Sequence, residues 1–255
     1  MFDLTGKVAV VTGGSRGIGR SICEQMAKAG AKVVVSSRKL PVCEEVVAAI
    51  KAKGGQAIAV AANISDKAQM ENLVAQSRAA FGKIDILVCN AAANPYYGPL
   101  KGLGDEMFLK IMQNNVLSNL WLCNLVCPEM AERKDGAVII VSSIGGLIGS
   151  KVLAGYGISK AADMSLVKSL AMEWGKSNVR VNAIAPGLIK TDFARALWEN
   201  PKIRAQMENN SPLGRIGEPD DIGGVAVFLA SKAAAFVTGQ TLIADGGVMV
   251  SGGES

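Results

Sequence analysis

Short runs of apolar residues, many of them β-branched, alternate along this chain with longer stretches whose apolar residues recur at helical spacing. The runs predict strands at 7–11, 32–35, 57–61, 85–89, 138–141, 179–184 and 241–244. The longer stretches predict helices at 17–29, 40–53, 66–81, 105–132 and 156–173. Several strands are apolar throughout, as is typical of parallel strands covered on both faces. The alternation predicts an α/β fold in which about seven parallel strands form one doubly wound sheet with helices on both faces.

The chain shows no low-complexity linker and no internal repeat, so we expect residues 1–255 to form a single domain. The stretch 187–212 breaks the pattern, because it combines two prolines with the large apolar residues Phe193 and Trp198. A long irregular insertion with exposed apolar side chains predicts a substrate lid at about 188–212. A packed surface helix or a subunit contact is the alternative interpretation.

Composition narrows the class of protein further. Hydrophobic residues make up 49% of the 255 positions, which is enough for a large buried core. The five cysteines are odd in number and lie in apolar segments, which favours buried thiols in a reducing compartment over a disulfide framework. No apolar run approaches the roughly 18 to 20 residues that span a bilayer, and no signal peptide is evident, so we expect a soluble cytoplasmic protein. The net charge of +5 is spread along the chain, which does not indicate a nucleic-acid partner.

The sequence contains no histidine. This excludes a histidine-ligated metal site and a Ser-His-Asp or Cys-His nucleophile, and we predict no bound metal. Any acid–base chemistry must therefore be carried out by other side chains. Cys123 and Cys127 could share a helical face, and we interpret them as small core residues in preference to a redox pair.

Tyr156 and Lys160 are four residues apart in a stretch that predicts a helix, so both side chains can lie on one face. A cation beside a phenol favours the phenolate and lowers the phenol pKa from its reference value of about 10. A proton donor and acceptor that works near neutral pH requires this property. A second pair with the same spacing, Tyr97 and Lys101, contains Pro99, which disfavours a continuous helix. We interpret that second pair as part of a loop.

The first predicted strand runs into Thr12-Gly13-Gly14-Ser15-Arg16-Gly17-Ile18-Gly19, and a predicted helix follows. Glycines allow a backbone to turn tightly and to approach a pyrophosphate, whose charge is stabilised at a helix N-terminus. Between a first strand and a first helix, this spacing is a strong signal for a dinucleotide site and predicts a Rossmann-type sheet. The predicted cofactor contacts in this loop are Gly13, Ser15, Arg16, Gly17, Ile18 and Gly19.

The second predicted strand ends at Ser37, which is followed by Arg38. Enzymes that select NAD normally carry an acidic residue about 20 residues after the glycines, where it binds the ribose 2′-hydroxyl. A carboxylate would repel a 2′-phosphate, whereas serine and arginine can bind one, and Arg16 could add a second positive charge. We therefore predict NADP(H) as the cofactor, with a solvated basic turn as the alternative.

Together these features resemble the short-chain dehydrogenase/reductase family over essentially the whole chain. The matching motifs, in chain order, are Thr12-Gly13-x-x-x-Gly17-x-Gly19, Asn90-Ala91-Ala92, Asn115, Ser143, Tyr156-x-x-x-Lys160, and Pro186-Gly187 with Thr191. Two positions depart from the family pattern. The acidic residue expected after the third strand, to contact adenine, is Asn63, and the usual Asn-Ala-Gly is Asn-Ala-Ala.

The resemblance implies that Tyr156 protonates a carbonyl oxygen while the nicotinamide gives up a hydride. Lys160 would lower the tyrosine pKa and bind the nicotinamide ribose, and Ser143 would hold the carbonyl oxygen. Spacing to Tyr156 favours Ser143 over the neighbouring Ser142. The further implied cofactor contacts are Ser37, Arg38, Asn63, Ile64, Asn90, Ala91, Pro186, Gly187, Ile189 and Thr191, besides Tyr156 and Lys160 themselves.

Asn115 would hold a water that links Lys160 to solvent, with Asn114 as the alternative because the two asparagines are adjacent. The substrate would contact Ser143 and an apolar wall, which suits a hydrophobic ketone or aldehyde better than a sugar. The residues of this implied wall are Tyr96, Ile144, Leu153, Ile189, Phe193 and Trp198.

Within the family, the pattern is most similar to the NADP-dependent carbonyl/retinol reductases of the peroxisomal type. The last residues, Gly252-Gly253-Glu254-Ser255, do not form a Ser-Lys-Leu-type address, so we expect no peroxisomal targeting through that signal. A 3-oxoacyl-[acyl-carrier-protein] reductase is the alternative, although those enzymes carry a basic residue where this chain has Met172. A non-catalytic NADP-sensing protein is a second alternative. The resemblance also implies a homotetramer, and the lack of a bilayer-length apolar run predicts no membrane partner.

Overall fold

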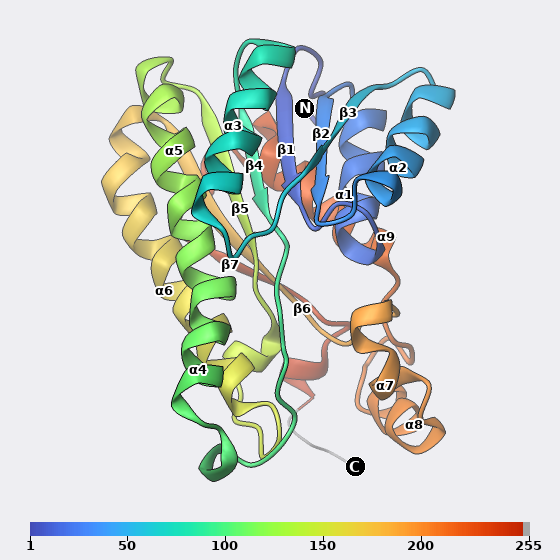
Figure 1. Ribbon diagram of the computed structural model, residues 1–255. Coiled ribbons are helices and arrows are strands. Elements are labelled where there is room, and N and C mark those ends of the chain that lie inside the picture. The colour runs from blue at the N-terminus through green and yellow to red at the C-terminus, as the bar shows by residue number, and fades with distance from the viewer. Residues whose placement is uncertain (252–255) are drawn as a thin grey trace.

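A single parallel sheet organises the computed structural model, which describes residues 1–251 (Figure 1). Its seven strands lie in the order β3-β2-β1-β4-β5-β6-β7, and each pairing is parallel. The strands are β1 (Val8–Thr12), β2 (Lys32–Ser37), β3 (Gln56–Ala61), β4 (Ile86–Cys89), β5 (Gly136–Val141), β6 (Val179–Pro186) and β7 (Thr241–Ala244). The doubly wound α/β fold predicted from the strand–helix alternation is therefore confirmed.

Helices cover both faces of this sheet. Those described are α1 (Gly17–Lys28), α2 (Leu40–Ala52), α3 (Lys67–Phe81), α4 (Asp105–Met112), α5 (Ser118–Glu132), α6 (Ala154–Trp174), α7 (Arg195–Trp198), α8 (Pro201–Asn209) and α9 (Pro219–Ala230). In Figure 1, α1, α2 and α9 lie on one face, and α3, α5 and α6 lie on the other. Neighbouring residues of a strand point to opposite faces, so Val33 and Val35 pack toward α1 and α9, whereas Val34 packs toward α3 and α5.

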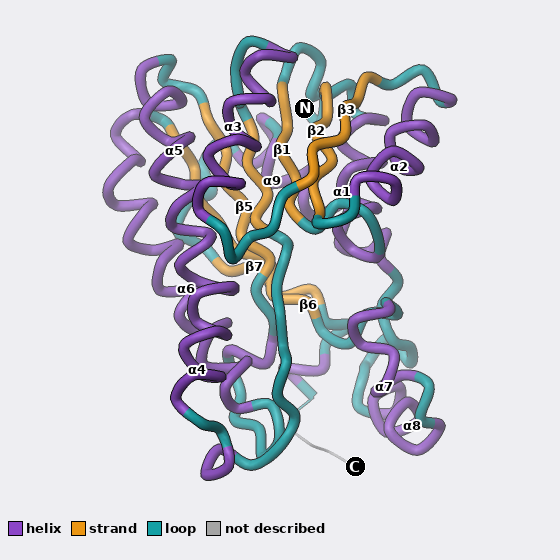
Figure 2. Tube along the Cα trace, viewed as in Figure 1, coloured by secondary structure: helices purple, strands orange, loops and turns teal. Residues whose placement is uncertain are grey.

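The strand order reverses between β1 and β4, which are adjacent although two strands separate them in the chain. In doubly wound sheets, ligands bind at the carboxyl ends of the strands beside such a reversal. The segments that follow β1, β4, β5 and β6 all leave the sheet at this carboxyl edge (Figure 2). Residues far apart in the sequence are thereby brought together at one end of the sheet.

The helix predicted at 105–132 is interrupted. A π-helical turn at Gln113–Leu117 separates α4 from α5 and contains the buried Asn115. The Asn115 side chain forms hydrogen bonds in both directions with the backbone of Ala93, and this anchoring holds the extra residue in the turn. Residues 105–127 contain no glycine or proline that would signal an interruption, which is why the sequence indicated one helix.

The stretch 187–212 was expected to be irregular, but it contains a 3₁₀ turn at Asp192–Ala194 and the two short α-helices α7 and α8. Asn200 caps α8 by accepting hydrogen bonds from the backbone N–H groups of Lys202 and Ile203, and Pro201 occupies the first turn. Asn200 and Pro201 therefore start a helix, whereas the sequence pattern indicated only a helix breaker at Pro201.

Three smaller expectations can be compared with the structure. All five cysteines are buried and free, which confirms the prediction of buried thiols. Tyr97 and Lys101 lie in a loop that ends in a single short turn at Leu100–Gly102, as predicted. Within residues 1–251, no helix combines the length and the apolar composition needed to cross a membrane. The terminal residues 252–255, on which the expectation about peroxisomal targeting rests, lie outside the described part of the chain.

Arg180 of β6 holds the carboxyl end of α9 against the sheet. Its guanidinium donates hydrogen bonds to backbone carbonyls that include those of Leu229, at 2.6 Å, and Ala230, at 3.2 Å. Burial lowers the pKa of Arg180, but not enough for an arginine to lose its proton near pH 7. The guanidinium therefore satisfies carbonyls that the end of a helix leaves without partners.

We expect Arg180→Met to lower the free energy of unfolding by about 2 kcal/mol, because the carbonyls at the end of α9 lose a charged donor. Urea unfolding followed by circular dichroism measures the change. The control is Arg20→Met, since Arg20 is an exposed helix residue paired with Glu24, and its loss should cost no more than about 0.5 kcal/mol. Equal losses in the two variants would contradict the role given to Arg180.

Candidate active site

The glycine loop after β1 and the asparagine after β4 are joined directly by hydrogen bonds. The Thr12 hydroxyl accepts from the backbone N–H groups of Asn90, at 3.0 Å, and Ala91, at 3.1 Å. The Asn90 side-chain amide donates to the carbonyls of Thr12 and Gly13, at 3.0 and 3.2 Å. Two motifs that lie far apart in the sequence therefore form one surface at the point where the strand order reverses.

The backbone of the loop requires glycine at specific positions. Gly13 and Gly17 have positive φ angles of 64° and 52°, which disfavour residues with a Cβ atom. A Cβ atom on Gly19 would lie 2.2 Å from the carbonyl oxygen of Gly13. Helix α1 begins at Gly17, and its N-cap residue Arg16 makes no side-chain cap hydrogen bond. The N–H groups of the first turn therefore have no side-chain cap, an arrangement that suits an anionic group.

The ends of β2 and β3 lie beside this loop. The N–H of Gly14 donates to the carbonyl of Ser36 at 2.9 Å, which places the half-buried Ser37 and the exposed Arg38 next to the glycines. The Ser37 hydroxyl lies 3.0 Å from the Cys43 thiol.

Asn63 and Ile64 follow β3 and are half-buried. The Asn63 side-chain oxygen accepts from the N–H of Ser65 at 3.2 Å, so this oxygen already stabilises a local turn. The amide nitrogen is the part of Asn63 that could make the adenine contact expected from the sequence.

Tyr156 and Lys160 both belong to α6, as the helical spacing predicted. The Lys160 ammonium lies 5.7 Å from the centre of the Tyr156 ring. Lys160 is only 2% exposed, and its ammonium donates to the carbonyl of Val141, at 2.9 Å, and to the carboxylate of Asp163, at 3.0 Å. The sequence reading did not identify Asp163, although a carboxylate three residues after a lysine on a helix was a usable signal.

The two adjacent serines after β5 have different environments. The Ser142 hydroxyl is buried and donates to the backbone carbonyl of Lys160 at 2.8 Å, so it ties β5 to α6. Ser143 is half-buried, and its hydroxyl accepts from the N–H of Gly145 at 3.0 Å. The Ser143 hydroxyl proton can therefore point toward a ligand.

Asn115 is fully buried in the π-helical turn. Its amide nitrogen donates to the hydroxyl of Ser159 at 3.0 Å, and its backbone carbonyl accepts from the side chain of Asn119 at 2.6 Å. Both polar atoms of the Asn115 side chain are engaged by Ala93 and Ser159. Asn115 therefore reaches the surroundings of Lys160 through α6 and through Asn119, without a direct hydrogen bond between the two residues.

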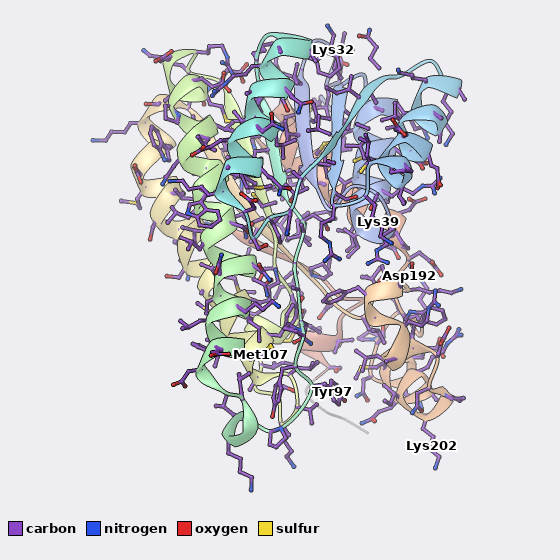
Figure 3. The ribbon with its side chains drawn as sticks, viewed as in Figure 1. Lys32, Lys39, Tyr97, Met107, Asp192 and Lys202 are labelled. Atoms are coloured by element: carbon purple, nitrogen blue, oxygen red, sulfur yellow. The ribbon has the colours of Figure 1, made fainter. Side chains whose placement is uncertain are left out.

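The segment after β6 approaches the glycine loop. A Cβ atom on Gly17 would lie 3.0 Å from the methyl group of Thr191, and the Arg16 guanidinium lies 3.7 Å from the Asp192 carboxylate. Gly187 donates to Ala244 of β7 at 3.0 Å, which fixes the start of the segment. Figure 3 labels Asp192 and Tyr97, which lie beyond the carboxyl edge of the sheet on the segments after β6 and β4.

The apolar residues of the predicted substrate wall are only partly gathered together. The ring of Phe193, which is 56% exposed, lies 6.1 Å from the Tyr156 ring, centre to centre. The N–H of Gly98 donates to the carbonyl of Val152 at 2.9 Å, which joins the loop of Tyr96 to the loop that contains Leu153.

Ile144, which directly follows Ser143, is half-buried. The other two members of that wall, Trp198 and Ile189, have contacts within the protein itself. The Trp198 indole donates to the carbonyl of Thr191 at 2.7 Å, which closes the segment on itself. The prediction that Ile189 belongs to the wall is wrong. Its side chain is 5% exposed and belongs to the buried apolar cluster that includes residues of α9, and its backbone pairs with Gly217 in an isolated bridge outside the sheet.

Comparison with known proteins places this geometry in a family. A family model described as Enoyl-(Acyl carrier protein) reductase matches residues 13–249. Dehydrogenase/reductase SDR family member 4 from Bos taurus is 40% identical over 244 residues, which are 96% of this chain and 88% of the relative.

Solved structures are similar over almost their whole length. A short-chain type dehydrogenase/reductase from Mycobacterium marinum has a TM-score of 0.92 at 32% identity, covering 98% of both chains. A 7α-hydroxysteroid dehydrogenase complexed with NADH and 7-oxo glycochenodeoxycholic acid has a TM-score of 0.93 at 36% identity, covering 96% of this chain and 95% of that one. The chain therefore belongs to the short-chain dehydrogenase/reductase family of oxidoreductases.

Proposed function

We propose that this protein is an NADP(H)-dependent oxidoreductase that interconverts a hydrophobic ketone or aldehyde and the corresponding alcohol. The observation that carries the proposal is the position of the buried Lys160 ammonium, 5.7 Å from the ring of the half-buried Tyr156. A buried cation beside a phenol favours the phenolate, which makes the phenol a usable acid and base. The solved 7α-hydroxysteroid dehydrogenase complex, which contains NADH and a 7-oxo steroid acid, supports this reaction type.

The residues at the carboxyl edge fit a nicotinamide dinucleotide. Gly13, Gly17 and Gly19 let the loop turn tightly where Cβ atoms would meet neighbouring protein atoms, and α1 presents its N-terminus beside this turn, which supports a pyrophosphate site. Arg38 is exposed beside Ser37, where a 2′-phosphate would carry negative charge, which supports NADP(H) over NAD(H). When bound, the cofactor supplies or accepts the hydride.

The chain itself supplies the proton and the orientation. In carbonyl reduction, the Tyr156 hydroxyl donates its proton to the carbonyl oxygen, and in alcohol oxidation the phenolate accepts it. The hydroxyl of Ser143 donates a hydrogen bond to the same oxygen, which stabilises the charge that develops there. Lys160 stabilises the phenolate through its charge, and its third N–H is available for a ribose hydroxyl because two are already used. Asn115 supports this arrangement by holding Ser159 of α6.

We assign substrate selection to residues 188–212, as a lid within a single domain. Phe193, which this segment carries, lies against Tyr156 and is largely exposed, so a bound ligand could cover it. The other apolar contacts that we propose are Tyr96, Ile144, Leu153 and Trp198. An apolar surface of this kind favours a hydrophobic carbonyl compound over a sugar.

Reduction of an acyl group on a carrier protein is the second candidate function. The description of the matching family model, which names an acyl carrier protein, favours it. An acidic carrier protein needs a basic docking surface, but position 172, where acyl-carrier-protein reductases of this family carry a basic residue, is a methionine that is 85% exposed. A homotetrameric assembly and a cytoplasmic location remain predictions from the sequence.

Tyr156→Phe should reduce the rate of NADPH oxidation with hydrophobic ketones by about 100-fold or more, because a general acid typically contributes 10²- to 10⁴-fold. The measurement is the loss of NADPH absorbance with a panel of ketones. Tyr97→Phe is the matched control, since Tyr97 is exposed and belongs to the loop copy of the same spacing. Turnover that survives Tyr156→Phe would refute the chemistry, and NADPH binding without turnover of any substrate would favour a sensor.

Arg38→Ala should reduce the preference for NADPH over NADH by at least 10-fold, since a charge-assisted contact with a 2′-phosphate contributes about 1.5 to 3 kcal/mol. The ratio of kcat/KM for the two cofactors measures it. Lys39→Ala is the control, because Lys39 is also exposed and basic but lies one position further from Ser37. Retention of the full preference in Arg38→Ala would show that the phosphate is bound elsewhere.

Gly19→Ala should weaken NADPH binding by at least 10-fold, because the added methyl group would collide with the Gly13 carbonyl at 2.2 Å. Gly224→Ala is the control, since Gly224 lies within α9 and a Cβ atom there meets nothing within 4 Å. The control should bind normally and gain about 0.5 to 1 kcal/mol of stability from its helical propensity. Fluorescence titration with NADPH measures binding, and similar affinities in the two variants would contradict the role of the loop.

A further inference from the structure

Asp163 is a buried carboxylate that the proposed mechanism does not use. Its side chain is 0% exposed, and one of its oxygens accepts a hydrogen bond from the Lys160 ammonium at 3.0 Å. Placing an ionised carboxylate in the interior costs free energy unless it is paired and hydrogen-bonded. The position beside Lys160 therefore calls for a role beyond packing.

The other oxygen of the carboxylate is also held. It accepts from the Asn119 side-chain amide at 3.0 Å, and the same amide nitrogen donates to the Asn115 carbonyl at 2.6 Å. Asn119 thus uses both of its N–H bonds as a bridge between the π-helical turn and Asp163. The carboxylate cannot rotate away from Lys160 without losing this anchor.

We propose that Asp163 is a positioning residue that keeps the Lys160 ammonium charged and oriented in the catalytic site. The proposal rests on the function proposed above, in which the charge of Lys160 stabilises the Tyr156 phenolate. Asp163 acts through Lys160, and we assign it no contact with substrate or cofactor. Asn119 is part of the same device, because it fixes the orientation of the carboxylate.

The charge of Lys160 needs this support because of its burial. Burial by itself lowers the pKa of Lys160, but the Asp163 carboxylate opposes that effect through its charge and its hydrogen bond, and the net direction is upward. Burial also raises the pKa of Asp163, against the opposing effect of Lys160. A buried lysine that lacks a counter-charge can lose its proton near neutral pH. Without the Asp163 carboxylate, a smaller fraction of Lys160 is therefore protonated, and Tyr156 faces less positive charge.

Other titratable groups near the pair do not supply a replacement. Lys160 is faced by Tyr156 of the same helix and by Cys89 of β4. Asp163 is faced by Cys123 of α5. A hydrogen bond with Cys127 lowers the pKa of Cys123, but the hydrogen bond with Cys89 and burial raise it well above its usual value. Cys123 is therefore a neutral thiol near pH 7. Among the described residues, Asp163 is the carboxylate that contacts Lys160.

The test is the pKa of Tyr156, measured by ultraviolet titration of the phenolate in Asp163→Asn and Asp163→Leu. The chain has three tyrosines, so subtracting the titration of the same protein with Tyr156→Phe isolates the residue. We expect the Tyr156 pKa to rise by about one unit or more in both variants, because a less charged Lys160 stabilises the phenolate less. The pH at which alcohol oxidation reaches half its maximal kcat should rise with it.

Two outcomes would overturn the proposal. An unchanged Tyr156 pKa would make Asp163 a packing residue, and a lower pKa would mean that the carboxylate only weakens the field of a lysine that stays charged. Asp85→Asn is the matched control, because Asp85 is also buried and paired with a lysine but lies at the opposite edge of the sheet. It should lose stability and leave the Tyr156 pKa unchanged.

Loss of folding can be distinguished from loss of the proposed role. Circular dichroism identifies variants that do not fold, and Asn119→Leu provides a further probe because it frees the carboxylate without removing its charge. That variant should shift the Tyr156 pKa in the same direction by less than Asp163→Asn does, and a larger shift would contradict the proposal. The titration requires no turnover, so a protein with no ketone reductase activity would refute the proposed function and still decide the role of Asp163.

Discussion

The candidate site depends on the pairing of one buried charge, the ammonium group of Lys160. Lys160 is 2% exposed, and a charge that is removed from water must be paired and hydrogen-bonded. The carbonyl of Val141 and the carboxylate of Asp163 meet this requirement. The hydroxyl of Ser142 donates to the Lys160 carbonyl and so fixes α6 against β5 at the same residue. The ammonium is therefore held by the sheet and by its own helix at once.

The π-helical turn extends this constraint to the other side of α6. A regular α-helix through 105–132 would have no extra residue per turn. The extra residue of the π-helical turn is what directs Asn115 inward. The turn lets Asn115 reach both Ala93 and Ser159, and it places its backbone carbonyl where Asn119 can bind it. The loop after β4, α5 and α6 are thereby linked through one asparagine, which holds three elements in fixed relation around Lys160.

The sequence predicted the sheet well because its signals are local. Burial of both faces gives parallel strands long apolar runs, and the glycine loop follows β1 directly, so the fold and the loop could be identified before any contact was known. The π-helical turn could not, since it depends on a contact between residues 22 positions apart. Asp163 did have a local signal, because it follows Lys160 by three residues on the same helix, but only the structure shows that both side chains are buried and paired. The same limit explains Ile189, whose apolar side chain suits a binding wall and a core equally until its bridge to Gly217 is known.

The helical part of the site could be predicted from the sequence more fully than the exposed segment that carries Phe193. Tyr156 and Lys160 lie on one 21-residue helix, so their spacing alone carries their geometry. Phe193 reaches Tyr156 from a segment with its own short helices, and it is 56% exposed, so little packing constrains the residues around it. In the function proposed here, chemistry depends on the helix and substrate choice depends on that segment. The type of reaction is therefore encoded in short, regular spacings, whereas the substrate is encoded in contacts that sequence patterns do not express.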